Sequence, residues 1–255
     1  MMKEKKGFVY GAFDIFNCAH LYSIQEAKRD CNQLTVGVYT DEHFVEVFGK
    51  KPILPFPDRI KIVGALYDVD QTVAVDDNSI NNYLDGYCTY AYHEKLDSQF
   101  EIRKLLRTSN KKTDSTISGK KRYQIGYTTG CFDMFHKGHL NILKQSKEMC
   151  DYLIVGISVD SLVAEYKGHP CSVPFEERAA IISNIKYVDQ VVPQTSLDKR
   201  IAWDDIHFDV LFHGSDYKGS KLFNDVSDKL KQVGADTVFF DYTEGISSTI
   251  IRSRL

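Results

Sequence analysis

Two histidines three residues apart, His136 and His139, have the types and spacing that point most directly to chemistry. They flank Gly138, and the apolar residues that follow recur with helical spacing, so the pair is expected on the first turn of a helix. Side chains three apart on a helix share one face. The amino end of a helix offers unpaired N–H groups, and glycine lets the backbone approach a phosphate closely. Two imidazoles there could stabilise the charge that grows on a phosphoryl group during transfer.

Two other interpretations of the histidine pair stay open at this point. Either imidazole could serve only the fold, and the pair could bind zinc together with Cys131. The lysine-containing phosphate loop of P-loop proteins does not occur in the sequence, so a phosphate site here must be of another kind.

The elements expected to position these residues alternate between strands and helices. Strands are predicted at 123–129, 152–158, 188–192, 209–213 and 236–240, and helices at 138–150, 175–186, 197–207, 222–233 and from 247. Asp160 is expected to cap a further short helix. This alternation predicts a parallel, doubly wound α/β sheet, which binds ligands beyond the carboxyl ends of its strands.

The chain also contains an internal repeat. When the sequence is shifted by 119 positions, residues 11–73 align with residues 130–192 without a gap, at roughly one third identity. We therefore expect two copies of one domain, at 1–108 and 122–255, joined by a polar linker at 109–121.

Two segments of the second copy carry a family resemblance. Residues 130–139 resemble the GxFDxxHxGH signature of the cytidylyltransferase family, and residues 243–249 resemble its second signature, RTxGISTT. Residues 214–219 and 187–192 resemble elements of the glycerol-3-phosphate cytidylyltransferases, and the tandem arrangement is similar to that of the phosphoethanolamine cytidylyltransferases. The resemblance implies an α/β fold of two tandem Rossmann-like domains of the HxGH nucleotidyltransferase type.

The resemblance also implies a reaction, in which CTP and a phosphomonoester give a CDP-alcohol and pyrophosphate, with Mg²⁺ accompanying CTP. The catalytic residues that it implies are His136, His139 and Lys167. The nucleotide-binding residues are Cys131, Phe132, Asp133, Gly138, Asp216, Thr243, Gly245, Ile246, Ser247, Ser248 and Thr249. The resemblance implies phosphate or substrate contacts for Arg178, Lys199 and Arg200, and it assigns no residue as a metal ligand.

Some positions depart from the family pattern or have a second interpretation. Tyr242 stands where the family has an arginine, and of a KxK pair only Lys167 remains. These changes affect mainly the substrate side. Asp133 could instead cap its turn, and Arg178, matched by Arg59 in the first copy, could instead pair across the interface between the copies.

The first copy has lost most of the pattern. Asn17 replaces the first histidine, Ala19 replaces the glycine, and Phe48 stands opposite Lys167. We expect this copy to be inactive and to act as a fused partner of the second, because family members commonly pair as homodimers. The alternative is that it binds a nucleotide without turnover. Further self-association of the chain is a separate possibility.

Composition limits the remaining choices. The chain has 255 residues, 43% of them hydrophobic and 26% charged, which is typical of a globular protein. A net charge of −3 argues against a non-specific nucleic-acid coat, and no apolar run reaches the roughly 18 residues of a membrane span. The start lacks the apolar region of a signal peptide and the six cysteines form no CxxC pair, so we expect a cytoplasmic protein with reduced thiols. Alternative functions are a phosphoethanolamine or phosphocholine cytidylyltransferase, an adenylyltransferase of the same superfamily, and a non-catalytic nucleotide-binding protein.

Overall fold

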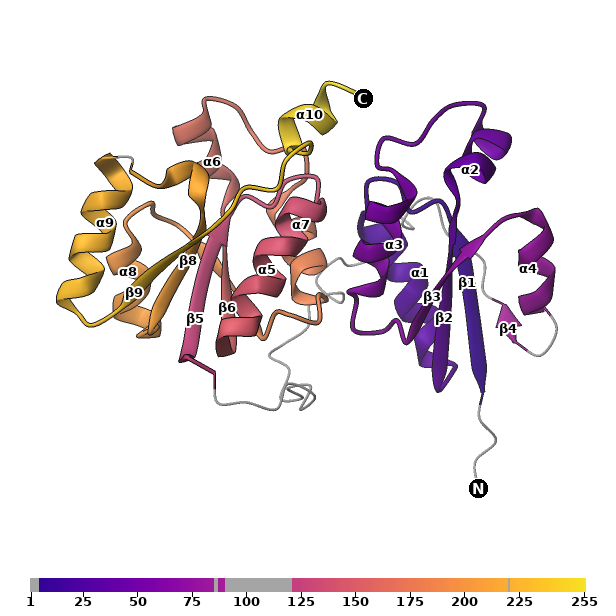
Figure 1. The fold of residues 1–255 in the computed structure, drawn as a ribbon, viewed down its shortest axis with the longest axis horizontal. Helices are drawn as coiled ribbons and strands as arrows, with labels where there is room; N and C mark the ends of the chain where they lie inside the picture. The colour runs from indigo at the N-terminus through magenta and orange to yellow at the C-terminus, as the bar shows by residue number, and fades with distance from the viewer. Residues whose placement is uncertain (1–4, 85–86, 90–120, 220) are drawn as a thin grey trace.

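The computed structural model describes residues 5–84, 87–89, 121–219 and 221–255, and places the two copies side by side (Figure 1). Each copy is built on a sheet of parallel strands, as the alternating pattern predicts. The expected boundary at 108 and almost all of the expected linker at 109–121 lie outside the described residues.

The C-terminal half holds a five-stranded sheet with strand order β7-β6-β5-β8-β9. Its elements are β5 (Tyr123–Gly130), α5 (Lys137–Met149), β6 (Cys150–Ser158), α6 (Asp160–Lys167), α7 (Phe175–Ser183), β7 (Gln190–Gln194), α8 (Lys199–Ile206), β8 (Val210–Gly214), the 3-10 turn η2 (Ser215–Tyr217), α9 (Lys221–Gln232), β9 (Asp236–Phe240) and α10 (Ser248–Arg252). The chain winds from β5 towards β7 and then returns to place β8 on the other side of β5. This reversal creates the switch point at which such sheets bind ligands.

The N-terminal half repeats the first part of this winding, with strand order β3-β2-β1-β4. Its elements are β1 (Lys6–Gly11), α1 (Cys18–Arg29), β2 (Gln33–Tyr39), α2 (Asp41–Phe48), α3 (Phe56–Gly64), β3 (Gln71–Val75), α4 (Asp77–Leu84) and the short β4 (Cys88–Thr89).

Three details of the second copy differ from the sequence-based expectation. Val159 rather than Asp160 is the N-cap of α6, and the Asp160 carboxylate instead binds Arg178 and the N–H of Phe175. The helix predicted to run to residue 186 ends at Ser183, because the next residues leave it to pair with the other half. The third strand therefore begins two residues later than expected.

The two halves pack through equivalent surfaces. Leu66 and Ile185 form an antiparallel bridge, and these residues occupy matching positions of the repeat. The flanking backbone bonds are Tyr67 N–H to Asn184 O (3.0 Å) and Lys186 N–H to Ala65 O (2.8 Å). Helices α1 and α3 face α7 and α5, and one buried apolar cluster contains residues of both halves (Figure 1). Each surface thus contributes the same positions, which is the pattern of a two-fold dimer interface within one chain.

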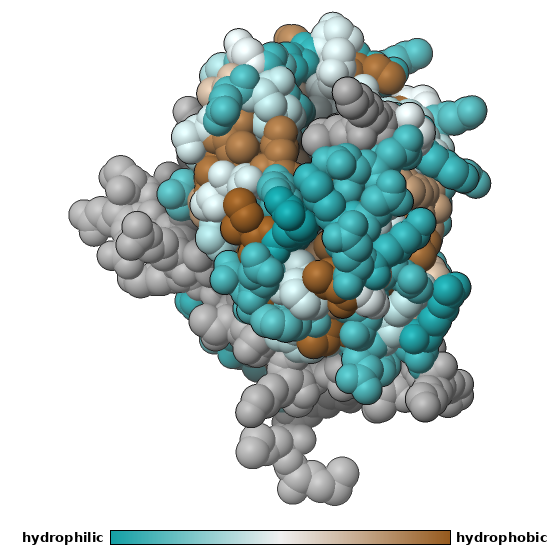
Figure 2. Space-filling model, turned by 90° about the vertical axis from the view of Figure 1, so that its left-hand side faces the viewer, coloured by the Kyte–Doolittle hydropathy of each residue, from teal (hydrophilic) through white to brown (hydrophobic). Residues whose placement is uncertain are grey.

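The outer face of the C-terminal half, over α8 and α9, is mostly hydrophilic with small separate hydrophobic patches (Figure 2). Within the described ranges, no helix combines the length and the apolar character needed to cross a bilayer. The six cysteines are unpaired, and three of them, Cys18, Cys31 and Cys150, are buried.

Candidate active site

A cavity of about 410 Å³ opens at the carboxyl edge of the C-terminal sheet, within the size range of small-molecule sites. All five strands end at it. The strand-end residues that line it are Thr129 and Gly130 of β5, Ser158 of β6, Gln194 of β7, His213 and Gly214 of β8, and Phe240 of β9. The amino ends of α5 and α10 complete the wall.

His136 both caps α5 and lines the cavity. Its Nδ1 accepts a hydrogen bond from the N–H of Gly138 at 3.1 Å, so the proton of the neutral ring is on Nε2. Burial lowers the pKa of His136 to about 4, so the ring is neutral at pH 7. Its Nε2–H is therefore available as a hydrogen-bond donor to a ligand in the cavity.

His139 lies directly against the first ring. The two imidazole centroids are 3.8 Å apart with planes inclined by 22°, and Phe132 and Phe135 pack against His139 on other sides. Its Nδ1 is buried and has no hydrogen-bond partner, and burial lowers its pKa well below the usual value. Aromatic packing therefore sets the orientation of this ring, and both histidines of the motif line the same cavity.

Gly138 is required by the ring that precedes it. A Cβ atom at this position would lie 2.9 Å from Cε1 and 3.0 Å from Nδ1 of His136. These distances are below ordinary contact, so any larger residue would displace the imidazole. The glycine thus serves the geometry of His136 as well as the approach of a ligand.

Five residues of the second signature segment line the cavity beside α5: Thr243, Ile246, Ser247, Ser248 and Thr249. Asn141 of α5 donates to the Thr243 hydroxyl at 3.0 Å, which ties the segment to the histidine helix. Ser248 donates to the backbone oxygen of Asp133 at 2.6 Å, and Ser247 caps α10 by accepting from the N–H of Ile250. The two signature segments, about a hundred residues apart in the sequence, therefore meet at one cavity.

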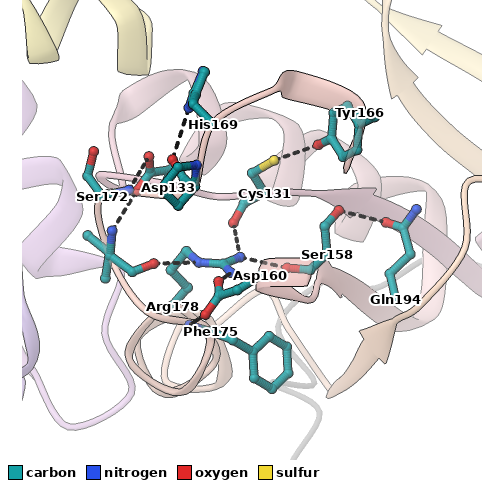
Figure 3. Close-up of polar contacts among 12 residues, drawn as sticks. Cys131, Asp133, Ser158, Asp160, Tyr166, His169, Ser172, Phe175, Arg178 and Gln194 are labelled. Carbon is teal, nitrogen blue, oxygen red and sulfur yellow. Dashed lines mark hydrogen bonds and ion pairs between the residues drawn. The ribbon is translucent and has the colours of Figure 1, made fainter. Parts of the chain in front are cut away.

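A thiol and a lysine lie at another part of the cavity. Cys131 Sγ is 2.7 Å from the hydroxyl oxygen of Tyr166, and Lys167 follows on α6 (Figure 3). A hydrogen bond from the Cys171 thiol is the main factor that lowers the pKa of Cys131, to about 5. The exposed Lys167 adds to this effect, because its positive charge also lowers the pKa of the Cys131 thiol.

Arg178, expected to contact phosphate, lies outside the cavity lining. Its guanidinium is buried and donates to the backbone oxygens of Val173, Cys131 and Ser158 and to Asp160 (Figure 3). It therefore ties together the ends of β5 and β6. Arg59 makes the matching contacts in the N-terminal half, to Leu54 O, Ala12 O and Asp41. Both copies keep this arrangement, although only one keeps the histidine pair, which favours a structural role. The contacts lie within each half rather than across the interface between the copies.

Asp133 is likewise occupied by structural contacts. Its carboxylate accepts from the N–H groups of Ser172 and Val173 and from Arg252, and it does not line the cavity. In the N-terminal half, Asp14 accepts in the same way from two backbone N–H groups.

The remaining predicted site residues divide between cavity and surface. Arg200 is exposed and bound to Asp198, and neither it nor Gly245 lines the cavity. Gly245 has a φ of 78°, which suits the glycine of a turn before α10. The predicted residues that do line the cavity are His136, His139, Lys167, Cys131, Phe132, Gly138, Asp216, Thr243, Ile246, Ser247, Ser248, Thr249 and Lys199.

Some residues with polar side chains that were not assigned to the site also line the cavity. Gln194 and Ser158 are both buried, and the Ser158 hydroxyl lies 3.2 Å from Gln194 Oε1 (Figure 3). His213 also lines the cavity, and burial lowers its pKa to about 4. The sequence places Ser158 and His213 at the carboxyl ends of predicted strands, where ligands bind. Gln194 was not identified, because the third strand was predicted to end at residue 192 and instead ends at Gln194.

The equivalent place in the N-terminal half is arranged differently. Asn17 caps α1 by accepting from the N–H groups of Ala19 and His20, and His20 Nδ1 accepts in return from the N–H of Asn17 at 3.1 Å. His20 is buried against Phe13 and Phe16. The same turn has thus become a capping box in which the surviving histidine stabilises the helix start.

The cavity presents a donor set that fits a metal carried in by a nucleotide. Its carboxylates are Asp216 and Asp241, both exposed. Mg²⁺ typically binds one or two carboxylates together with substrate phosphates. Across the described ranges, the three side chains with the spacing of a metal site are His43, Glu46 and Asp77, which lie in the N-terminal half.

Comparison with known proteins agrees with this geometry. A family model described as cytidylyltransferase-like matches residues 8–118 and 127–254. The chain belongs to the cytidylyltransferase-like family. Both halves are covered by the match, so the family includes the copy that lacks the histidine pair as well as the copy that has it.

Individual relatives match about half of the chain. The ethanolamine-phosphate cytidylyltransferase of Mus musculus is 36% identical over 138 residues, which are 54% of this chain and 34% of the mouse protein. The bifunctional protein HldE of Gluconacetobacter diazotrophicus is 36% identical over 131 residues, 49% of this chain and 26% of that protein. A solved structure, the lipopolysaccharide core biosynthesis protein from Thermoplasma volcanium, is 26% identical with a TM-score of 0.41, over 48% of this chain and 97% of that one. The match thus spans about a third or less of the two curated relatives. Family membership supports a nucleotidyltransferase role for the chain.

Proposed function

We propose that the C-terminal half transfers CMP from CTP to a phosphomonoester of the glycerol 3-phosphate type and releases pyrophosphate. The observation that carries the proposal is the stacked pair His136 and His139 at the amino end of α5, which lines one cavity together with residues of the segment 243–249. An oxygen of the acceptor phosphate forms a bond to the α-phosphorus of CTP. The bond from that phosphorus to the bridging oxygen breaks, and pyrophosphate leaves.

In this reaction the protein positions charge and forms no covalent intermediate. His136 donates from Nε2 to an oxygen of the transferring phosphoryl group, and His139 supports the ring and contacts the same group. Lys167 binds phosphate oxygens, and the N–H groups at the start of α10 hold the nucleotide. Asp216 or Asp241 would hold Mg²⁺ together with the triphosphate, and the ion would neutralise negative charge there.

The N-terminal half is proposed to have no turnover of its own. Asn17 has no ionisable group, and its amide is used in capping α1. His20 is buried in aromatic contacts, with its Nδ1 bonded to the backbone. The half therefore serves as the permanent partner of the C-terminal half.

Pyrophosphate release from the full chain tests the proposal. The protein is incubated with Mg²⁺, one of the four nucleoside triphosphates, and one of a panel of phosphomonoesters. Turnover with CTP and sn-glycerol 3-phosphate supports the proposal. Turnover with ATP alone would replace it with an adenylyltransferase, and nucleotide binding without pyrophosphate release would replace it with a non-catalytic role.

A further inference from the structure

The buried end of the cavity holds an unpaired positive charge. Lys199, the first residue of α8, lines the cavity and is only 5% exposed. Within the described part of the chain it makes no hydrogen bond or ion pair. The adjacent carboxylate of Asp198 is bound to Arg200 at 3.0 Å and caps the helix. Burying an ammonium group without a partner is unfavourable, so this lysine is placed for a ligand rather than for the fold.

Two neutral polar groups that line the same cavity already have hydrogen-bond partners. The Ser158 hydroxyl bonds to Gln194 Oε1 (Figure 3). The Gln194 amide nitrogen donates to the backbone oxygen of Ser196 at 2.9 Å. Among these three side chains, Lys199 is the donor that is left for a ligand. The carboxylates of the cavity, Asp216 and Asp241, are both exposed and do not neutralise it there.

The charge states of Lys199 and His213 decide which ligand groups this part of the cavity can accept. Burial lowers the pKa of Lys199 to about 8, so the side chain is still mostly protonated at pH 7. His213, whose pKa is lowered by burial and by the charge of Lys199, is neutral and adds no negative charge. A cationic group of a ligand would meet repulsion in this water-poor environment, whereas hydroxyl, phosphate or carboxylate oxygens would accept from the ammonium.

We propose that Lys199 is a specificity-determining residue, which selects acceptors whose alcohol part carries hydroxyl or anionic oxygens and rejects acceptors whose alcohol part carries a cation. The inference rests on the proposed function and narrows its substrate class to polyol or sugar phosphates. It separates this chain from its mouse relative, whose name specifies an ethanolamine phosphate.

Acceptor kinetics test the inference. With CTP as donor, kcat/KM is measured for sn-glycerol 3-phosphate and for phosphoethanolamine, in the parent protein, Lys199→Met and Lys199→Arg. We expect kcat/KM of the parent protein to be about tenfold or more higher for glycerol phosphate than for phosphoethanolamine. In Lys199→Met this ratio should fall at least about tenfold, because KM for glycerol phosphate rises. Lys199→Arg, which keeps the charge, should retain most of the preference.

Lys144→Met is the matched control, because Lys144 is exposed on α5 and pairs with Glu148 outside the cavity. This substitution should leave the ratio of kcat/KM for the two acceptors unchanged. A parent that prefers phosphoethanolamine would overturn the inference. So would a Lys199→Met variant that raises KM for CTP and leaves the acceptor ratio unchanged, because the lysine would then serve the nucleotide.

Direct binding keeps this inference separate from the proposed function. If pyrophosphate is released with no combination of a nucleoside triphosphate and an acceptor, the proposed function fails. Calorimetric titration of the full chain with each acceptor then decides the inference alone. Tighter binding of glycerol 3-phosphate, lost in Lys199→Met but not in Lys144→Met, supports it. Equal affinity for the two acceptors, or no binding of either, contradicts it.

Discussion

Lys137 Nζ lies 3.1 Å from Asp58 Oδ2, so the residue between His136 and Gly138 is bound to the other half of the molecule. Asp58 belongs to α3, and its side chain is only 7% exposed. The pair at the matching positions of the repeat is Cys18 and Glu177, joined by a bond from the thiol to a backbone oxygen. The ion pair thus occurs only on the side that faces the histidines. The N-terminal half therefore helps to hold the turn that carries His136.

Asp58→Asn should weaken both the fold and the reaction. The substitution leaves a partly buried ammonium without its carboxylate, and we expect a loss of about 1–3 kcal/mol in the free energy of unfolding. The start of α5 should also become less well held, so kcat should fall while KM for CTP changes little. Urea unfolding and steady-state kinetics measure the two effects. Glu177→Gln is the symmetry-matched control, and equal behaviour of the two variants would refute a special role for Asp58.

Gly138→Ala should reduce turnover through the neighbouring ring. The added methyl group would lie 2.9 Å from Cε1 of His136 and displace the imidazole. In a His136→Asn background the same change should cost little stability, because the N-terminal half already combines Asn17 with Ala19. A double-mutant cycle of unfolding free energies measures this coupling. Additive effects of the two substitutions would mean that the ring does not require the glycine.

Acidification should destabilise the protein well above the range in which carboxylates titrate. Burial lowers the pKa of His136 and of His213 to about 4, and that of His20 to about 3, against about 6.5 in an unfolded chain. Between these values the unfolded chain binds protons that the folded chain does not. Stability is therefore fully present above pH 6.5 and is lost as the pH falls towards 4.

Each such histidine should lower the free energy of unfolding by about 1–2 kcal/mol between pH 7 and pH 5. Denaturant unfolding at several pH values measures how the free energy of unfolding depends on pH. His136→Asn should reduce this dependence by the contribution of one histidine. Equal stability at pH 7 and pH 5 would mean that these rings are not buried as described.

Cys131 should be the most reactive thiol of the chain at neutral pH. Hydrogen bonds from Cys171 and Tyr166 lower its pKa to about 5, whereas burial raises the pKa of Cys18 and of Cys150 to about 12. Iodoacetamide labelling followed by peptide mapping should find modification first at Cys131, and CTP should slow it. Labelling that begins at a different cysteine would argue against the lowered pKa of Cys131, and labelling that CTP does not affect would argue against nucleotide binding in this cavity.

The winding of the sheet could be predicted from the sequence because apolar periodicity and turn residues determine where strands and helices occur. The errors lie where distant contacts decide. The helix that begins at Phe175 ends early because residues 184–186 pair with the other half, and no local signal reports that pairing. Asp160 looks like a cap, yet a buried arginine 18 residues further on takes its carboxylate.

The candidate site was predictable to the extent that its residues belong to contiguous motifs. His136, His139 and five residues of the segment 243–249 line the same cavity. Arg178 and Asp133 have the right types, but their partners are backbone groups brought together only by folding. Lys199 was named together with Arg200 as a phosphate or substrate contact. Its burial and its lack of a partner are visible only in three dimensions.

The central claim is that the imidazole of His136 stabilises phosphoryl transfer. The most direct test compares His136→Asn with the parent for pyrophosphate release from CTP and glycerol 3-phosphate. Asn17 shows that asparagine caps the equivalent helix, so the variant should fold, and its thermal unfolding should confirm this. We predict a loss of turnover of at least about 100-fold, whereas Asn17→Ala should leave turnover nearly unchanged. Near-parental turnover in a folded His136→Asn, or a comparable loss in Asn17→Ala, would contradict the account.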